Sequence, residues 1–329
     1  MDSMRKKLMI PARPALPAMV LEAARAAAAR YARGSRAPAT WRAYESDWKV
    51  FTAWCASAKQ PALPAEPSTV ALFLAAQAKL GRAPSTLDRR LAAIRLMHVG
   101  AKVAPPHDAL EVAEVMRGIR RAWKRPVAQK APALEQDVKK MSALVEADTL
   151  RGLRDRAVLL LGFAGALRRS EVVALDVEDL TEQQEGINIR IRTSKTDQEG
   201  VGETVAIPRV PNSPYCPVRA LQAWLQTAAV TTGPVFRRMY RGDSVGAARL
   251  TAQSIALIVK DLAQKVGLDA RRYAGHSLRS GFLTSAARRR ASLFKMADQS
   301  RHRSLDVLRE YVRNEERFED HAGDGMLRA

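Results

Sequence analysis

The sequence contains few cysteines, and their placement argues against two classes of site. Cys55 and Cys216 are the only two in 329 residues, and the chain has neither a CxxC pair nor an HExxH motif. A disulfide framework needs several cysteines, and a zinc site needs clustered cysteine or histidine ligands. We therefore expect two reduced thiols and no metal site.

Long apolar runs are also lacking. The longest, from Ala157 to Leu167, falls well short of the roughly 20 residues that a membrane helix needs. The N-terminus is interrupted by Arg13 and several prolines, where a signal peptide would have an unbroken apolar stretch. We expect a cytoplasmic protein that does not bind a membrane.

Acidic residues are too few to balance the basic ones. The chain has 34 Asp and Glu against 54 Lys and Arg, which gives a formal charge of +20. Such a surface attracts polyanions. The basic residues are spread along the chain and do not gather on one amphipathic segment, so the composition favours nucleic acid over an anionic membrane surface.

The length and the proline pattern predict two domains, since domains commonly run to roughly 100–200 residues. Residues 1–18 are rich in proline and basic residues and are expected to form a flexible arm. Residues 19–124 are expected to form an all-helical domain punctuated by prolines. Its helices are expected at 20–32, 40–58, 68–80, 85–98 and 108–124. Two prolines and little periodic apolar content indicate an exposed linker at 125–134.

The second domain, residues 135–329, is expected to be mainly helical with a small sheet. The stretch 149–167 is typical of a buried helix. Isoleucines alternate with polar residues at 187–191 and are followed by the turn-rich SKTDQEGVGE and the return run TVAIP, which predicts a β-hairpin. Apolar residues between 255 and 266 share one face of a helix. The expected fold is therefore mainly α, with a C-terminal α+β domain that contains a small antiparallel sheet.

Four segments carry residues suited to chemistry: GALRRSE (165–171), TSKTD (193–197), GHSLR (275–279) and RHRSLDVLREY (301–311). Each has an ordinary structural explanation when taken alone. Arg168 fits a solvated helix face, His276 fits a helix cap, and Tyr311 lies beside the apolar residues Leu308 and Val312, where an aromatic ring usually packs in a core.

Taken together, the segments meet the needs of phosphodiester cleavage without a metal. Guanidinium groups match the charge and shape of a phosphate in the transition state, and Arg168 and Arg279 fit that role. Lys195, on the hairpin, is suited to protonate a leaving oxygen. The remaining candidates are two histidines, which bind phosphate or handle a proton, and a tyrosine nucleophile. They are His276, His302 and Tyr311.

The ordered set Arg168, Lys195, His276-x-x-Arg279, His302 and Tyr311 resembles the catalytic signature of the tyrosine recombinase (phage integrase) family. By position Arg168, and not Arg169, matches the family's first arginine, and Glu171 matches the acidic residue that supports the site. His302 stands where the family has His or Trp. Residues 41–74 and 89–108 resemble the family's helical core-binding (SAM-like) domain, and EYVRNEE (310–316) resembles the sequence around its nucleophile.

The resemblance implies a site-specific recombinase that acts on double-stranded DNA with a short inverted-repeat core site. Tyr311 would attack the scissile phosphate and form a 3′-phosphotyrosyl intermediate, and strands would exchange through a Holliday junction. A homotetramer on two DNA sites is implied, with a monomer or weak oligomer in the absence of DNA and with accessory DNA-bending proteins as optional partners. The covalent link conserves the energy of the phosphodiester, so no cofactor is expected.

DNA contacts are expected mainly from the helix at 85–98. Leu87, Leu91, Ile94 and His98 form its apolar face, whereas Arg89 and Arg90 are expected to lie away from the centre of that face. Arg89 is the candidate for a groove contact, and a phosphate contact is the ordinary alternative. Basic residues at the linker are expected to follow the DNA backbone. They are Lys124 and Arg125.

Two other functions remain open at this point. A type IB topoisomerase would use the same covalent chemistry for relaxation alone. A non-catalytic DNA-binding relative would be expected to lack at least one catalytic residue, yet the full set is present. If the chain is a recombinase, integration, excision and dimer resolution all fit the sequence.

Overall fold

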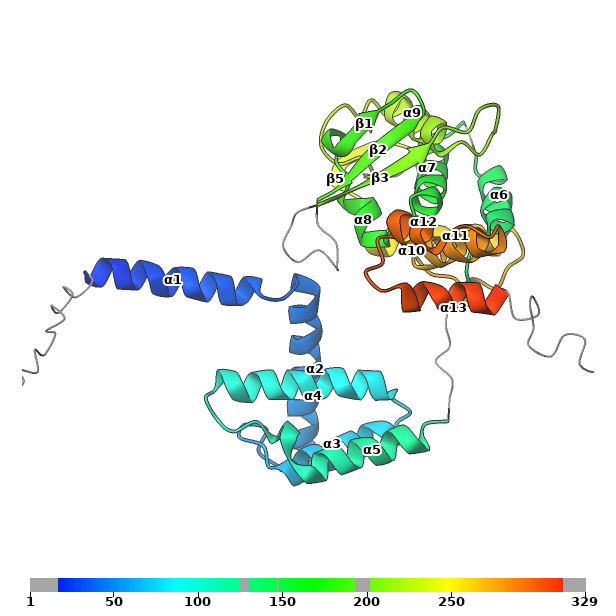
Figure 1. Cartoon of the computed structure of the whole chain (residues 1–329). Helices are drawn as coiled ribbons and strands as arrows, with labels where there is room; N and C mark the ends of the chain where they lie inside the picture. The colour runs from blue at the N-terminus through cyan, green and yellow to red at the C-terminus, as the bar shows by residue number, and fades with distance from the viewer. Residues whose placement is uncertain (1–16, 125–129, 147, 193–201, 316–329) are drawn as a thin grey trace, which may run out of the picture. The chain divides into compact units, whose positions relative to one another are not determined.

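The computed structural model describes residues 17–124, 130–146, 148–192 and 202–315, and the chain divides into two compact units between Val127 and Ala128 (Figure 1). Both units are mainly helical, and the second also contains two small antiparallel sheets. The expected fold class is therefore confirmed. Within the described ranges, no helix combines the length and the apolarity that a membrane span requires.

The first unit consists of α-helices and one short 3₁₀ helix. They are α1 (Ala18–Gly34), α2 (Pro38–Ser57), α3 (Pro67–Lys79), α4 (Pro84–Gly100), η1 (Pro106–Asp108) and α5 (Leu110–Ala122). Three of the helices begin at a proline, which suits the first helical position because its fixed φ is already helical and that position needs no N–H donor.

The core of this unit lies among α2, α3, α4 and α5. Phe51 and Phe73 are fully buried, with ring centroids 5.0 Å apart in an edge-to-face arrangement. His98 is also fully buried: its Nε2 accepts from the Ala65 N–H at 2.9 Å, and its Nδ1 donates to the Ile94 carbonyl at 2.8 Å. Both ring nitrogens are thus satisfied inside an apolar core.

The second unit is built around α7. Its helices are α6 (Glu135–Ala143), α7 (Leu150–Ala164), α8 (Arg169–Ala174), η2 (Val177–Asp179), α9 (Pro217–Thr227), α10 (Ala252–Lys265), η3 (Ala270–Arg272), α11 (Ser277–Arg288), α12 (Leu293–Ser300) and α13 (Leu305–Glu315). The α7 helix is capped by Thr149, whose side chain accepts from the Gly152 N–H, and its apolar residues from Ala157 to Leu161 are buried as expected. A smaller cluster joins α11, α12 and α13 through Leu283, Met296 and Leu308.

The sheets confirm the expected hairpin. Its strands are β2 (Gly186–Ile191) and β3 (Glu203–Pro208), which pair antiparallel with Ile189 opposite Val205, and β1 (Leu180–Glu182) adds to the free edge of β2. A second ribbon consists of β4 (Arg237–Met239) and β5 (Val245–Arg249). The alternating isoleucines of β2 face the core of the unit, and this burial fixes the register.

Residues 130–134 differ from the exposed linker expected there. Ala133 is fully buried, and its N–H donates to the Ser277 carbonyl on α11 at 2.8 Å. The approach is close because Gly281 has no side chain: a Cβ at that position would lie 1.7 Å from the Ala133 carbonyl oxygen. The rest of the expected linker, residues 125–129, and the arm up to residue 16 lie outside the described residues.

We expect Gly281→Ala to destabilise the second unit by about 1–3 kcal/mol, because a methyl group there forces the backbone at Ala133 away from α11. Thermal or urea unfolding of the full chain measures the effect. Gly118→Ala in α5 is the matched control, since nothing lies within 4 Å of its Cβ and alanine favours a helix interior. Equal stabilities for the two variants would show that the contact is not tight.

Candidate active site

The described catalytic candidates lie at the ends of helices in the second unit. Arg168 immediately precedes α8, His276 precedes α11, and Arg279 lies in the first turn of α11. His302 lies between α12 and α13, and Tyr311 is on α13. Both α12 and α13 pack against α11 through the smaller apolar cluster. Residues from three of the four segments singled out in the sequence therefore gather at one place.

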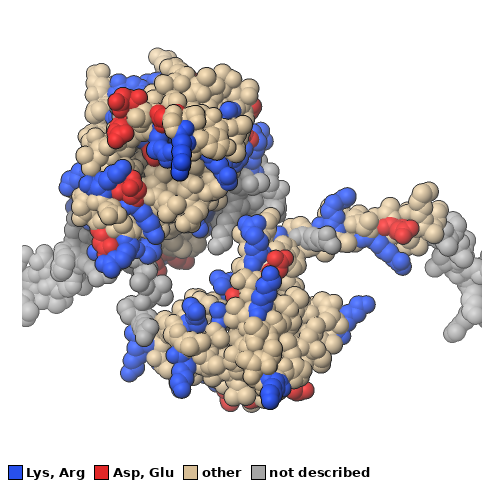
Figure 2. All heavy atoms as spheres, turned by 180° about the vertical axis from the view of Figure 1, so that it is seen from behind, with Lys and Arg blue, Asp and Glu red and all other residues tan. Residues whose placement is uncertain are grey.

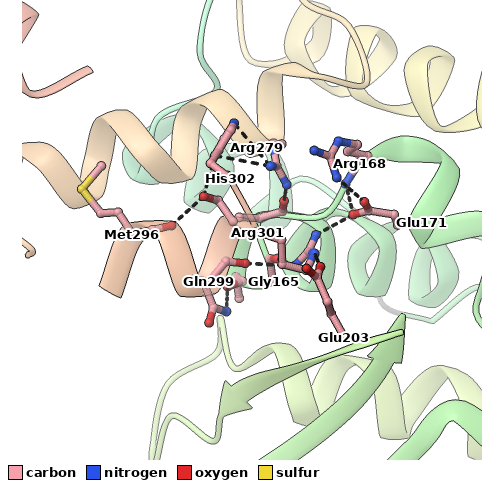
Figure 3. A network of polar contacts seen from close by, with 12 residues as sticks. Gly165, Arg168, Glu171, Glu203, Arg279, Met296, Gln299, Arg301 and His302 are labelled. Carbon is pink, nitrogen blue, oxygen red and sulfur yellow. Dashed lines mark hydrogen bonds and ion pairs between the residues drawn. The ribbon is translucent and has the colours of Figure 1, made fainter. Parts of the chain in front are cut away.

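Glu171 links two arginines through both of its carboxylate oxygens (Figure 3). Its Oε1 accepts from Arg168 Nη1 at 2.6 Å, and its Oε2 accepts from the Arg168 N–H at 2.8 Å and from Arg301 Nη2 at 2.6 Å. Burial would raise the pKa of Glu171, but the two guanidinium groups and the backbone N–H outweigh it and lower the pKa. Glu171 is thus a buried carboxylate that fixes Arg168 in place.

Arg279 is almost completely buried, at 1% exposure. Its Nη1 donates to the Ala166 carbonyl at 2.7 Å, and its Nη2 lies 3.4 Å from both ring nitrogens of His302. Burial, with the nearby charges of Arg168 and Arg301, lowers its pKa to about 9. Arg279 remains a cation at neutral pH, in a position where an anion would relieve its desolvation and repulsion.

His302 is held by Ser300. The Ser300 hydroxyl donates its only hydrogen to the Met296 carbonyl at 2.6 Å, so the 2.7 Å contact with His302 requires Nδ1–H to be the donor. The neutral ring therefore has its lone pair on Nε2. Burial, followed by the charges of Arg279 and Arg168, lowers the pKa of His302 to about 4, so this ring is neutral at neutral pH.

His276 immediately precedes α11 and is close enough to Arg279, Arg168 and Arg169 to feel their charges. Desolvation of the ring, followed by these charges, lowers its pKa below the usual value. The His276 imidazole, like that of His302, is therefore neutral at neutral pH and able to accept a proton.

Tyr311 is partly buried against the cluster of α11, α12 and α13. Burial raises its pKa, and the nearby Arg279 charge offsets only part of that rise. The phenol is thus protonated at neutral pH and must lose its proton as it reacts. Tyr311 therefore packs against apolar residues, as an aromatic ring at this spacing usually does, and also lies near the charged Arg279.

Several predicted residues lie elsewhere. Lys195 and Arg125 lie outside the described residues. Lys124 is exposed just after α5. Arg89, on α4, is half-exposed and forms a bidentate ion pair with Asp47 of α2, with Nε to Oδ2 at 2.6 Å and Nη2 to Oδ1 at 3.1 Å.

Arg90 differs from expectation because it is buried, at 8% exposure, and does not face solvent. Its Nη1 donates to Gln77 Oε1, its Nε lies 3.6 Å from Asp47 Oδ1, and its guanidinium stands over the Phe73 ring. Arg90 lies three residues after Leu87 and four before Ile94, which places it on the same face as these core residues. It therefore packs the helices of the first unit together.

Two residues of the site, Arg301 and Ser300, were not predicted from the sequence. Arg301 belongs to the same segment as His302, and its side chain is 3% exposed and reaches Glu171. The only signal in the sequence was its place next to His302. Within the described residues, no three His, Cys, Asp or Glu side chains gather as a metal site would require.

Comparison with known proteins gives two family matches and extended similarity to whole proteins. The phage integrase family model matches residues 134–317, and the model of the phage integrase N-terminal SAM-like domain matches residues 31–103. An integrase/recombinase XerD homolog from Selenomonas ruminantium is 39% identical over 295 residues, which cover 89% of this chain and 86% of that protein. Recombinase Cre from Escherichia phage P1 is 24% identical over 296 residues, with 84% of each chain covered.

Solved structures share the fold. The Tn1549 transposon integrase in complex with transposon right end DNA aligns with a TM-score of 0.57 and 14% identity, covering 87% of this chain and 92% of that one. The XerH site-specific recombinase bound to difH substrate aligns with a TM-score of 0.56 and 16% identity, over 83% and 76% of the two chains. With these matches the expected resemblance is confirmed, and the chain belongs to the phage integrase family as a tyrosine recombinase.

Proposed function

We propose that this recombinase cleaves double-stranded DNA by attack of Tyr311 on the scissile phosphate. The observation that supports the proposal most directly is the gathering of Arg168, Arg279, His302 and Tyr311 at one place. Among the residues that the structure describes, the fully paired Glu171 is the one acidic side chain buried with them. Such a site is preorganised to bind the phosphate group of a phosphodiester.

In the proposed step, Tyr311 Oη bonds to phosphorus and the bond from phosphorus to the 5′ oxygen breaks. The phenol proton passes to one of the two neutral imidazoles, His276 or His302, and Lys195 gives a proton to the departing 5′ oxygen. Arg168 and Arg279 neutralise the charge on the non-bridging oxygens. The products are a 3′-phosphotyrosyl bond and a free 5′-hydroxyl.

The second half of the reaction reverses the first on another strand. The 5′-hydroxyl of a partner strand attacks the phosphotyrosine, and two such exchanges pass through a Holliday junction. Because each phosphodiester is conserved as a covalent link, the exchange is nearly isoenergetic and needs neither ATP nor another cofactor. We infer a homotetramer on two short inverted-repeat sites, assembled from a monomer or weak oligomer, with accessory DNA-bending proteins as optional partners and the cytoplasm as the location.

DNA binding is proposed to follow the basic surface. Lys and Arg side chains outnumber Asp and Glu on the face that Figure 2 shows, consistent with the formal charge of +20. Arg89 and Lys124 are the described candidates for phosphate or groove contacts. Asp47 holds Arg89 in one orientation, which suits a defined contact. Arg90 is not included because of its burial. Binding is expected to weaken steeply with salt.

A covalent-trapping experiment tests the proposal. The full chain is incubated with a pool of nicked duplexes taken from DNA that flanks its gene, in EDTA, then denatured and examined for DNA attached to protein. We expect an adduct that survives denaturation, because the short fragment between the scissile phosphate and the nick, which carries the free 5′-hydroxyl, diffuses away and the link cannot be reversed. Labels at either end of the strand should place the protein on a 3′ phosphate.

Tight DNA binding without any adduct would instead favour a non-catalytic DNA-binding protein. Sequencing of the trapped DNA supplies the target site for the next assay. Recombination is then separated from simple relaxation by mixing two labelled duplexes that contain this site: a type IB topoisomerase reseals each duplex, whereas a recombinase joins strands from different duplexes. Relaxation of supercoiled DNA does not distinguish the two.

A further inference from the structure

Arg301 is a buried cation at the centre of the polar network of the site (Figure 3). Its Nη2 donates to Glu171 Oε2 at 2.6 Å, and its Nη1 donates to the Gln299 carbonyl at 2.9 Å, with the Gly165 carbonyl at 3.4 Å. With a side-chain exposure of 3%, the guanidinium cannot touch a DNA phosphate itself. Any effect on the reaction must therefore pass through its neighbours.

Arg301 is the residue at which α12 ends, and its backbone adopts a left-handed conformation. Its φ is +56° and its ψ is +46°, in the left-handed region that residues with a Cβ seldom adopt. Seven other residues with a Cβ among those described have a positive φ, so what distinguishes Arg301 is that its charged side chain is buried at such a turn. A lysine or arginine that served only solubility would not be buried at such a turn.

The positive charge of Arg301 compensates for the negative charge that Glu171 places next to Arg168. The Glu171 carboxylate fixes Arg168 but also sets a negative charge 2.6 Å from it, in a buried place where screening by water is weak. Arg168 and Glu171 together carry no net charge. With Arg301 included, the three side chains carry one net positive charge. Arg168 is 17% exposed, whereas Glu171 and Arg301 are almost completely buried, so Arg168 is the one of the three that can present this charge to a ligand.

A second carboxylate near Arg301 does not cancel this effect. Glu203 Oε2, at the start of β3, lies 3.6 Å from Arg301 Nε, and neither atom has a hydrogen-bond partner among the described residues. The Glu203 Oε2 atom is buried, but the side chain as a whole is 40% exposed, so water screens part of its charge. Its distance from Arg301 is also longer than the 2.6 Å between Arg301 and Glu171, a pair that is almost completely buried.

We propose that Arg301 is a positioning residue whose buried charge offsets that of Glu171, so that Arg168 presents net positive charge to the scissile phosphate. The inference rests on the proposed function for its catalytic consequence. Two further groups of the site feel the same charge, because Arg301 contributes to the lowered pKa values of Arg279 and His302.

A double-mutant cycle tests the proposal. Arg301→Met keeps the length of the side chain but removes its charge, and we expect adduct formation on a nicked duplex to slow by about 10-fold or more, with smaller changes in DNA affinity. Adding Glu171→Gln to that variant removes the uncompensated carboxylate while its amide oxygen still accepts from Arg168. The double variant is therefore expected to cleave about 10-fold faster than Arg301→Met alone.

A titration of the free protein gives a readout that needs no activity. NMR of the histidine ring protons follows His302, assigned by its loss in His302→Gln. With one neighbouring cation removed, the His302 pKa should rise in Arg301→Met relative to the wild type, in which it is about 4. Arg238→Met, at an exposed position on β4, is the charge-matched control and should leave the titration unchanged.

The outcomes separate the two proposals. A double variant no faster than Arg301→Met, with an unchanged His302 titration, overturns the role of Arg301 and would mark it as a packing residue. Absence of any adduct from the wild type overturns the proposed function instead. In that case a shifted His302 titration would still support the electrostatic link, and an unchanged one would reject it.

Discussion

Tyr311→Phe is expected to abolish DNA cleavage and to leave DNA binding intact. Only the phenol oxygen is removed, so the bond to phosphorus cannot form, and the rate of adduct formation should fall at least about 10⁴-fold. The ring packs against Leu308 and its neighbours on α11 and α12, and phenylalanine fills the same space, so folding should change little. Gel electrophoresis of denatured complexes measures the adduct, and titration with the same duplex measures binding.

The matched control is Tyr240→Phe, because Tyr240 lies at an exposed position beyond β4 and its hydroxyl has no part in the proposed chemistry. Wild-type cleavage by this variant shows that removal of a phenol oxygen is not harmful in general. If Tyr311→Phe still forms a covalent adduct, another residue is the nucleophile and the assignment of Tyr311 is wrong.

Much of the fold was predictable because its signals are local. Prolines at 38, 67 and 84 begin helices, alternating isoleucines specify β2, and apolar residues at helical spacing place α10 against the core. Each of these patterns depends on neighbours within a few residues. The segment at 130–134 was predicted as exposed linker because its burial depends on Gly281, far away in the sequence.

The residues of the site likewise divide into those that local sequence spacing predicts and those that depend on distant contacts. Residue types at fixed spacing were enough to suggest Arg168, His276, Arg279, His302 and Tyr311, and the structure places all five in the same unit. Their roles stay predictions until tested. Arg301 was not predictable, because its importance comes from a left-handed turn that directs it to a carboxylate 130 positions away.

The prediction that Arg90 lies away from the core was wrong for a different reason. The spacing that predicts Leu87 and Ile94 in the core also places Arg90 on that face, although an arginine is usually exposed. Arginine can be buried where neighbours compensate its charge. Here Gln77 accepts a hydrogen bond from Nη1, and the Asp47 carboxylate lies 3.6 Å from Nε. A charged residue that lies at core spacing should therefore be tested for burial before it is assigned to a ligand.

The second large effect is expected from Arg279→Lys, which keeps the charge but changes the geometry. The guanidinium spans two partners: Nη1 donates to the Ala166 carbonyl, while Nη2 lies beside His302. A lysine ammonium is a single point of charge and cannot hold the carbonyl and face a phosphate at once. We expect cleavage to slow by about 10²–10³-fold.

DNA affinity should fall far less than the cleavage rate in Arg279→Lys, because one phosphate contact is a small part of a salt-dependent interface. Arg238→Lys at the exposed position on β4 is the control for the exchange of arginine for lysine and should cleave normally. Equal losses of binding and cleavage would indicate a general role in DNA affinity. A loss of cleavage alone would locate the effect in the transition state, where the in-plane donors of the guanidinium match the phosphate oxygens and a lone ammonium does not.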